Sequence, residues 1–175
     1  MYAHPNHKIH VTALQRVLTH AIPFRGILYR ACDPTYANAR DLLTGEGSQK
    51  AGGRWNGPKT FAIVYLAGTV EGAIAESLGL PGVFGFDPAA RLPLTLVAVE
   101  VQMDMVLDFT DALVRRALAV TMTTMNPCDW RSENAAGREA GTRSLGRAAF
   151  EVGFQGIIVP TAVKRTFKNL NLFPA

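Results

Sequence analysis

The chain has 175 residues and a mass of 18.9 kDa, the usual size of one domain, and a chain of this length buries roughly 70% of its unfolded surface on folding. Apolar residues make up 48% and charged residues 18%, a balance that excludes an intrinsically disordered protein. The net charge of +4 suits a polyanionic partner or a small anionic ligand, but the basic residues are scattered, which favours a solvated surface over direct nucleic-acid binding.

No segment predicts a membrane helix or a signal peptide. The longest nearly uninterrupted apolar stretch, residues 61–67, is far shorter than the ~20 residues needed to cross a bilayer. The first residues alternate polar and apolar types without the hydrophobic segment of a secretory signal. We therefore expect a cytoplasmic protein with no membrane partner.

The N-terminal part is predicted to be a helical extension, residues 1–25, ahead of one folded unit over residues 26–175. Thr12 is placed to cap a helix that runs to about His20, before Pro23 stops it. The Gly- and Pro-rich stretches further along have the length of loops rather than linkers. The sequence therefore predicts a single folded domain.

The histidines and cysteines near the start and along the chain predict no metal site. His4, His7 and His10 lie three residues apart, but zinc needs rigid geometry and usually a fourth ligand, so a mobile polar N-terminus is favoured. Cys32 and Cys128 belong to no Cys-x-x-Cys motif, which favours reduced structural thiols.

The middle of the chain predicts a strand followed by a strand–turn–helix unit. Residues 26–30 are rich in strand formers, and Pro34 closes that strand. A buried strand over residues 60–67 then leads to a helix that Thr69 caps and that runs to about Leu78.

The C-terminal half mixes both kinds of element. Apolar periodicity predicts helices at residues 111–119 and 145–152, and strands at 94–101, 106–109, 156–159 and 170–173. Because strands and helices are interspersed without strict alternation, the prediction is an α+β fold with a mixed sheet and flanking helices.

Residues 45–57, read as a loop, carry the strongest local signal. They contain five glycines in thirteen residues, and Arg54, Trp55 and Asn56 follow directly after two of them. An arginine fork and approachable backbone N–H groups suit a phosphorylated ligand. A glycine turn that packs Trp55 on the core and exposes Arg54 explains the segment equally well.

Four further residues are candidates with ordinary alternatives. Tyr29 and Arg30 pair an aromatic ring with a guanidinium at the end of a strand, although Arg30 could also form a salt bridge. Tyr65 lies in an apolar strand and could belong to the core. Glu76 is the acid of a small, apolar helical segment, and it could simply be exposed.

Taken in chain order, short motifs run from about residue 26 to the C-terminus. They are Leu28-Tyr29-Arg30, Gly45-x-Gly47-Ser48, Gly52-Gly53-Arg54-Trp55-Asn56, Val64-Tyr65-Leu66-Ala67, Ala73-x-x-Glu76, Gly153-Phe154-x-Gly156, Val159-Pro160-Thr161-Ala162 and Asn169-Leu170-x-Leu172-Phe173. This series resembles the RES domain, the toxin of RES–Xre toxin–antitoxin modules. The element Gly-Gly-Arg-Trp-Asn is specific to that family.

The resemblance implies which residues carry the family's name, an Arg, a Glu and a Ser. Arg54 and Glu76 match the first two, while Thr161 stands where the family has serine. Threonine keeps the hydroxyl but adds a β-methyl that restricts χ1, so a hydrogen bond survives with shifted geometry.

The resemblance also implies a fold similar to ADP-ribosylating toxins and an activity that consumes NAD⁺ by cleaving its nicotinamide–ribose bond. Glu76 would stabilise the oxocarbenium-like ribose. Arg54 and Arg30 would clamp the pyrophosphate, and Tyr29 and Tyr65 would flank the nicotinamide. Thr161, Asn56 and Asn169 would also bind the substrate; neither a metal nor a resident cofactor is required.

Several functions remain open. The acceptor of the ADP-ribosyl group could be water, as in a glycohydrolase, or phosphate, as in a phosphorylase. The group could instead be transferred to a protein. A chain inactivated at Thr161 could survive as a binding or regulatory module, and an RNA-targeting toxin fits the scattered charge less well. The family implies an Xre-type antitoxin with a helix-turn-helix domain as the partner, so that this chain contacts no DNA directly.

Overall fold

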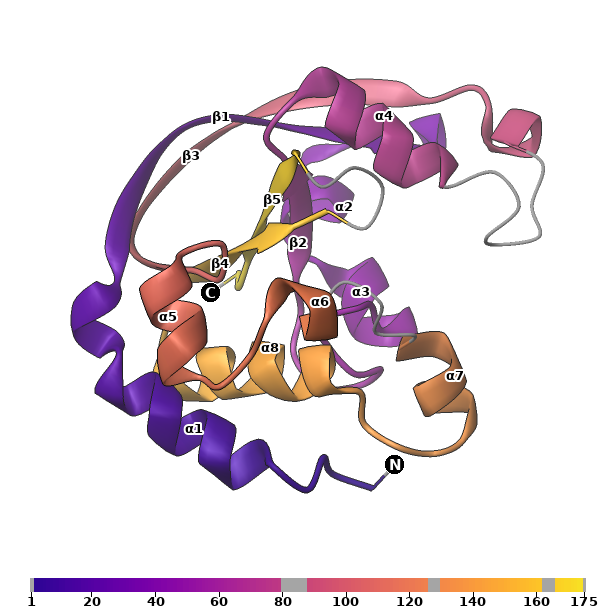
Figure 1. Cartoon of the computed structure of the whole chain (residues 1–175). Helices are drawn as coiled ribbons and strands as arrows, with labels where there is room; N and C mark the ends of the chain where they lie inside the picture. Colours follow the sequence, from indigo (N-terminus) through magenta and orange to yellow (C-terminus); the bar gives the residue numbers. More distant parts are fainter. Residues whose placement is uncertain (1, 80–87, 126–129, 162–165, 175) are drawn as a thin grey trace.

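The computed structural model describes residues 2–79, 88–125, 130–161 and 166–174 (Figure 1). Cys128 and the basic residues Lys164 and Arg165 lie outside the described residues, as does Ala162 of the Val-Pro-Thr-Ala motif. Within the described parts of the chain, no helix is long and apolar enough to span a membrane.

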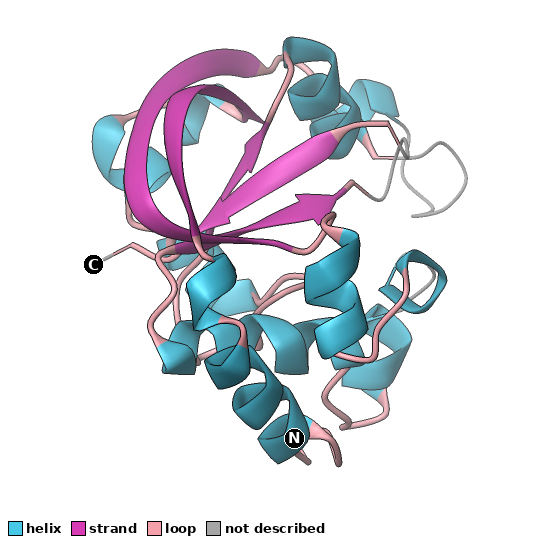
Figure 2. Cartoon of the chain, turned by 60° about the vertical axis from the view of Figure 1, so that its left-hand side comes forward, coloured by secondary structure: helices cyan, strands magenta, loops and turns pink. Residues whose placement is uncertain are grey.

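Five strands form a closed barrel in the order β1-β2-β5-β4-β3. Every neighbouring pair is antiparallel except β3 and β4, so the sheet is mixed. Figure 2 shows the strands curving together on one side, with most helices gathered beneath them. The strands are β1 (Ile22–Cys32), β2 (Val64–Ala67), β3 (Thr95–Asp108), β4 (Gly156–Pro160) and β5 (Lys168–Leu172).

The α+β prediction is confirmed, but two strands are longer than expected. The predicted strands 94–101 and 106–109 are one strand, β3, because its exposed face accepts the polar residues between them. β1 begins at Ile22 and includes Pro23, which was expected to end a helix. The β1–β3 pairing shifts register at this proline, so its missing N–H removes no hydrogen bond from the regular pairing of the two strands.

The predicted helices over residues 70–78, 111–119 and 145–152 are present. Thr69 caps α4, its hydroxyl accepting the Gly72 N–H at 3.0 Å, and Gly153 ends α8 at φ +96°. The helices are α1 (His7–Arg16), α2 (Ala39–Leu43), α3 (Glu46–Ala51), α4 (Val70–Leu78), α5 (Ala112–Ala117), α6 (Met122–Met125), α7 (Trp130–Ala135) and α8 (Gly141–Val152).

The glycine-rich segment is not the continuous loop that the sequence predicts. Its first half forms α3, which Gly45 precedes at φ +67° and Gly52 ends at φ +74°. A Cβ at Gly45 would lie 2.9 Å from the Ile63 backbone, so glycine is needed there for close approach as well as for φ. Two of the five glycines therefore bound a helix.

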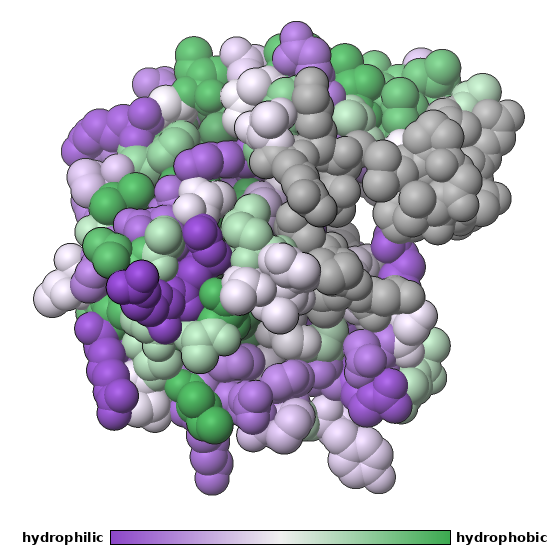
Figure 3. Space-filling view, in the orientation of Figure 1, coloured by the Kyte–Doolittle hydropathy of each residue, from purple (hydrophilic) through white to green (hydrophobic). Residues whose placement is uncertain are grey.

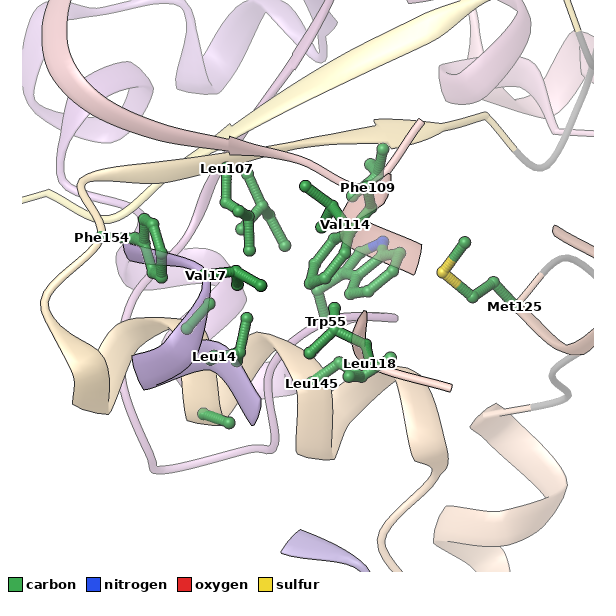
Figure 4. Packing of buried hydrophobic residues seen from close by; sticks show 14 of the residues in the cluster. Leu14, Val17, Trp55, Leu107, Phe109, Val114, Leu118, Met125, Leu145 and Phe154 are labelled. Carbon is green, nitrogen blue, oxygen red and sulfur yellow. The ribbon is translucent and has the colours of Figure 1, made fainter. Parts of the chain in front are cut away.

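The main hydrophobic core lies between the sheet and α1, α5 and α8. Trp55 is buried near its centre, stacked on Phe109 at 5.5 Å between ring centroids (Figure 4). Leu14 and Val17 of α1 belong to the same cluster. A second cluster is formed by buried residues of β1, β2, β3 and β5. Figure 3 shows hydrophobic residues gathered over α4, where the side chain of Ile74 is partly exposed.

The N-terminus is ordered by its histidines, so the expectation of a mobile segment is wrong. α1 begins at His7, five residues before the predicted cap Thr12. The Nδ1 atoms of His7 and His10 lie 3.2 and 2.8 Å from the Ser144 hydroxyl on α8, and Glu151 lies 2.9 Å from His7 Nε2. Residues three apart share one helix face, which brings both rings to the same serine.

We expect the stability of the fold to fall between about pH 6.5 and 4 because of His10. Burial, and then the charges of His4 and His7, lower its pKa to about 4, against an attraction to Glu139. The unfolded chain therefore binds a proton in this range that the folded chain does not, which costs about 2 kcal/mol.

Urea unfolding at pH 7.5, 5.5 and 4.5 measures this loss. His10→Gln should flatten the pH dependence, whereas the same change at exposed His20 should leave it intact. An unchanged slope in His10→Gln would assign the pH dependence to other groups.

Candidate active site

A cavity of about 260 Å³ lies between β1, β2, β5 and α4. Among the described residues, it brings together five of the eight predicted site residues. A larger hollow of about 660 Å³, beside α1 and α5, includes none of them. The five that line the smaller cavity are Tyr29, Arg30, Tyr65, Glu76 and Asn169.

Glu76 lies on the last turn of α4 and is exposed at the cavity. The Asn169 amide donates to its Oε1 at 3.1 Å, which links the helix to β5. The next residue, Ser77, donates from its hydroxyl to the Ala31 carbonyl at 2.5 Å. The Thr69 cap at the start of α4, the Ser77 hydroxyl and the Asn169 amide therefore hold Glu76 close to β1, the strand that carries Tyr29 and Arg30.

Arg30 supplies a positive charge from β1. Its Nη1 donates to the Leu42 carbonyl at 2.6 Å, so α2 fixes the direction of the guanidinium. Burial lowers the pKa of Arg30, with smaller opposing effects from Cys32 and Asp41, yet an arginine remains charged at neutral pH. The cavity therefore has a fixed cation as well as a carboxylate.

Tyr65 lines the cavity from β2, and its hydroxyl is hydrogen-bonded to the turn over residues 52–56. The hydroxyl donates to Asn56 Oδ1 at 2.9 Å and accepts the Trp55 N–H at 3.2 Å. Burial raises the pKa of Tyr65 well above its ordinary value, against the lowering effects of the Trp55 N–H and of two nearby arginines. The phenol stays neutral, so Tyr65 can bind but cannot serve as a base.

Asn56 lies behind Tyr65, not in the cavity wall. It is fully buried, and its amide donates to the Ser48 carbonyl at 3.0 Å and the Phe61 carbonyl at 2.9 Å. With its oxygen taken by Tyr65, the side chain has no group directed to a ligand. This differs from the expected substrate contact: Asn56 reaches the cavity through Tyr65.

Arg54 and Thr161 also lie outside the walls formed by the described residues. Arg54 Nη2 donates to the Met125 carbonyl at 2.5 Å, and its guanidinium carbon is 5.7 Å from the Trp55 ring centroid. Thr161, 2% exposed, follows β4, and its N–H donates to the Phe167 carbonyl at 3.2 Å.

The structure agrees in part with the glycine-turn interpretation of residues 45–57. Trp55 is part of the core, as the glycine-turn interpretation expects, but Arg54 is half-buried rather than exposed. A Cβ at Gly53 would lie 2.3 Å from the Tyr65 hydroxyl. The glycine is therefore required by the approach of the turn to a residue of the cavity.

Arg143 was missed by sequence reasoning. It is fully buried on α8, and its Nε donates to the Gly53 carbonyl at 2.8 Å. On a helical wheel it lies opposite the apolar face that Leu145, Ala148 and Val152 form, where a solvent-exposed residue is expected. No signal in the sequence identifies it, because α8 is buried on almost every side.

The His, Cys, Asp and Glu side chains of the described residues form no close cluster. No group of three or more His, Cys, Asp or Glu side chains there could hold a metal ion. The histidines that do lie together at α1 are engaged with Ser144 and Glu151.

These features define a single-domain α+β protein in which a closed, mixed sheet carries a pocket lined by a glutamate, a half-buried arginine and two tyrosines. The chain belongs to the RES domain family: the family model matches residues 27–175.

Two comparisons agree with this assignment. The NAD(+) phosphorylase MbcT of Mycobacterium tuberculosis is 29% identical over 154 residues, which cover 86% of this chain and 78% of the relative; the Mycobacterium bovis protein of the same name matches equally. The crystal structure of the M. tuberculosis MbcT–MbcA toxin–antitoxin complex has a similar fold, with a TM-score of 0.67 at 24% identity, covering 91% of this chain and 81% of that one.

Proposed function

We propose that this chain is a toxin that degrades NAD⁺ by cleaving the nicotinamide–ribose bond, with phosphate as the favoured acceptor and water as the alternative. The observation that carries the proposal is that one cavity is lined by Glu76, Arg30, Tyr29 and Tyr65 together. Membership of the RES family and the similarity to an NAD(+) phosphorylase support it.

The chemistry needs a negative charge beside the ribose. As the bond from C1′ to the nicotinamide nitrogen breaks, both electrons leave with nicotinamide, and the ribose gains oxocarbenium character. Glu76, held by Asn169, stabilises this positive charge and binds the ribose hydroxyls. An oxygen of phosphate, or of water with loss of a proton to solvent, then bonds to C1′.

The cations serve the pyrophosphate. Arg30 lines the cavity with its guanidinium direction set by Leu42, which suits a fixed anionic group. Arg54 lies outside the cavity walls, and its charge opposes only in small part the burial that raises the pKa of Tyr65, so its proposed role is an indirect one. Thr161 directly follows β4, whose Val159 pairs with Asn169, so we place Thr161 near the β5 end of the site.

The proposed partner is an Xre-type antitoxin with a helix-turn-helix domain that covers the cavity. Similarity of fold to the toxin in a toxin–antitoxin complex supports a partner of this class. Contact with DNA would then be made by the antitoxin. The activity would take place in the cytoplasm, where the proposed substrate is available.

The experiment that tests this function measures nicotinamide release from NAD⁺ by the purified chain, with and without inorganic phosphate. We expect release that is faster with phosphate and a phosphorylated ADP-ribose product. Equal rates with free ADP-ribose would identify a glycohydrolase. Label from NAD⁺ appearing on a protein would identify a transferase, and folded protein that neither binds nor consumes NAD⁺ would contradict the proposal in favour of a binding module.

A further inference from the structure

Arg143 carries a buried charge that the proposed reaction does not use. Besides the bond to Gly53, its Nη1 donates to Asn134 Oδ1 at 2.9 Å, and the guanidinium carbon lies 4.8 Å from the Trp130 ring centroid. Burying an ion costs free energy unless hydrogen bonds replace its hydration. A guanidinium at this place is therefore best explained by what it binds, the turn over residues 52–56.

Helix α8 contacts that turn closely at two points. At one end, a Cβ on Gly52 would lie 2.9 Å from Arg143 Nη2. At the other, a Cβ on Gly146 would lie 2.0 Å from the Trp55 carbonyl oxygen. The helix and the turn are thus too close for a side chain at either glycine. The hydrogen bond from Arg143 Nε to the Gly53 carbonyl links them.

The same turn holds Tyr65. The Trp55 N–H and the Asn56 side chain both bond to the Tyr65 hydroxyl, and Gly53 lies against it. Tyr65 is also one of the residues that line the cavity. A shift of the Gly53 carbonyl therefore moves the tyrosine on the cavity side of the turn.

We propose that Arg143 is a positioning residue for the candidate active site: it holds the Gly53 carbonyl and, through Trp55 and Asn56, sets the place of Tyr65. The geometry of the turn does not depend on what the cavity binds. Only the kinetic consequence rests on the proposed function, since Tyr65 would flank the nicotinamide.

The test compares Arg143→Lys with Arg147→Lys. Lysine keeps the charge at 143, but one ammonium cannot reproduce the planar fork that reaches both Gly53 and Asn134. Arg147 is the matched control because it lies one turn further along α8 and binds Glu139 and Glu151 instead. Hydrogen exchange of the Gly53 and Trp55 amides, followed by NMR, reports the turn directly.

We expect Arg143→Lys to speed exchange of both amides about tenfold and to lower kcat/KM for NAD⁺ loss about ten- to a hundredfold, mainly through KM. Arg147→Lys should do neither. A merely structural role would lower the melting temperature without separating KM from kcat. Asn134→Ala, which removes one partner of Arg143 and leaves the arginine, should give a smaller change in the same direction and replaces Arg143→Lys if that variant does not fold.

Three results would overturn the inference: wild-type exchange in the Arg143 and Asn134 variants, equal acceleration in Arg147→Lys, or faster exchange with unchanged kcat/KM in an active protein. If the wild-type chain consumes no NAD⁺, the proposed function fails. Exchange alone then decides whether Arg143 holds the turn, so the two failures are distinguishable.

Discussion

Replacing Glu76 by glutamine is expected to lower kcat for NAD⁺ loss about a hundred- to a thousandfold. The change removes the negative charge that would stabilise the ribose cation, and an interaction made at the developing charge is worth this much in related chemistry. The glutamine oxygen can still accept from Asn169, and residue 76 is exposed, so the fold should be unchanged. Nicotinamide release measures the rate, and calorimetry with NAD⁺ measures binding.

Glu71→Gln is the matched control for this experiment. Glu71 lies on the first turn of the same helix, is exposed, and is absent from the described walls of the cavity. It should keep the wild-type rate. A Glu76→Gln protein with near wild-type release would show that another group stabilises the ribose, whichever acceptor the enzyme uses.

Replacing Gly146 by alanine is expected to lower the free energy of unfolding by about 3 kcal/mol. Alanine is the better helix former by up to about 1 kcal/mol, so propensity alone predicts a gain. The new Cβ, however, would lie 2.0 Å from the Trp55 carbonyl oxygen and 2.9 Å from its carbon. These are backbone atoms in the core, so relief requires α8 and the turn to separate, and overpacking outweighs propensity.

Gly47→Ala is the control, because Gly47 lies inside α3 with no atom within 4 Å of an added Cβ. It should be neutral or stabilising by up to about 1 kcal/mol. Urea denaturation compares the two variants. A stable Gly146→Ala protein would mean that the contact between α8 and Trp55 is looser than its geometry indicates.

The sequence by itself determined the elements whose signals are local. The Thr69 cap and the apolar periodicity of residues 145–152 predicted α4 and α8, since capping and periodicity depend only on neighbouring residues. The motifs around Arg30, Arg54 and Glu76 identified the family. Four of the five predicted site residues that line the cavity, Tyr29, Arg30, Tyr65 and Glu76, lie within strands and a helix that the sequence predicted, whereas Asn169 lies just before the predicted strand 170–173.

Only the tertiary structure decided where those elements meet. The closed barrel, the extension of β1 through Pro23 and the helix within the glycine-rich segment depend on register and close approach between distant segments, which no local pattern encodes. The same holds for the site. Asn56 is hidden behind Tyr65, and Arg143 is buried on the side of α8 opposite its apolar face, because the turn over residues 52–56 packs on this helix some ninety residues later in the chain.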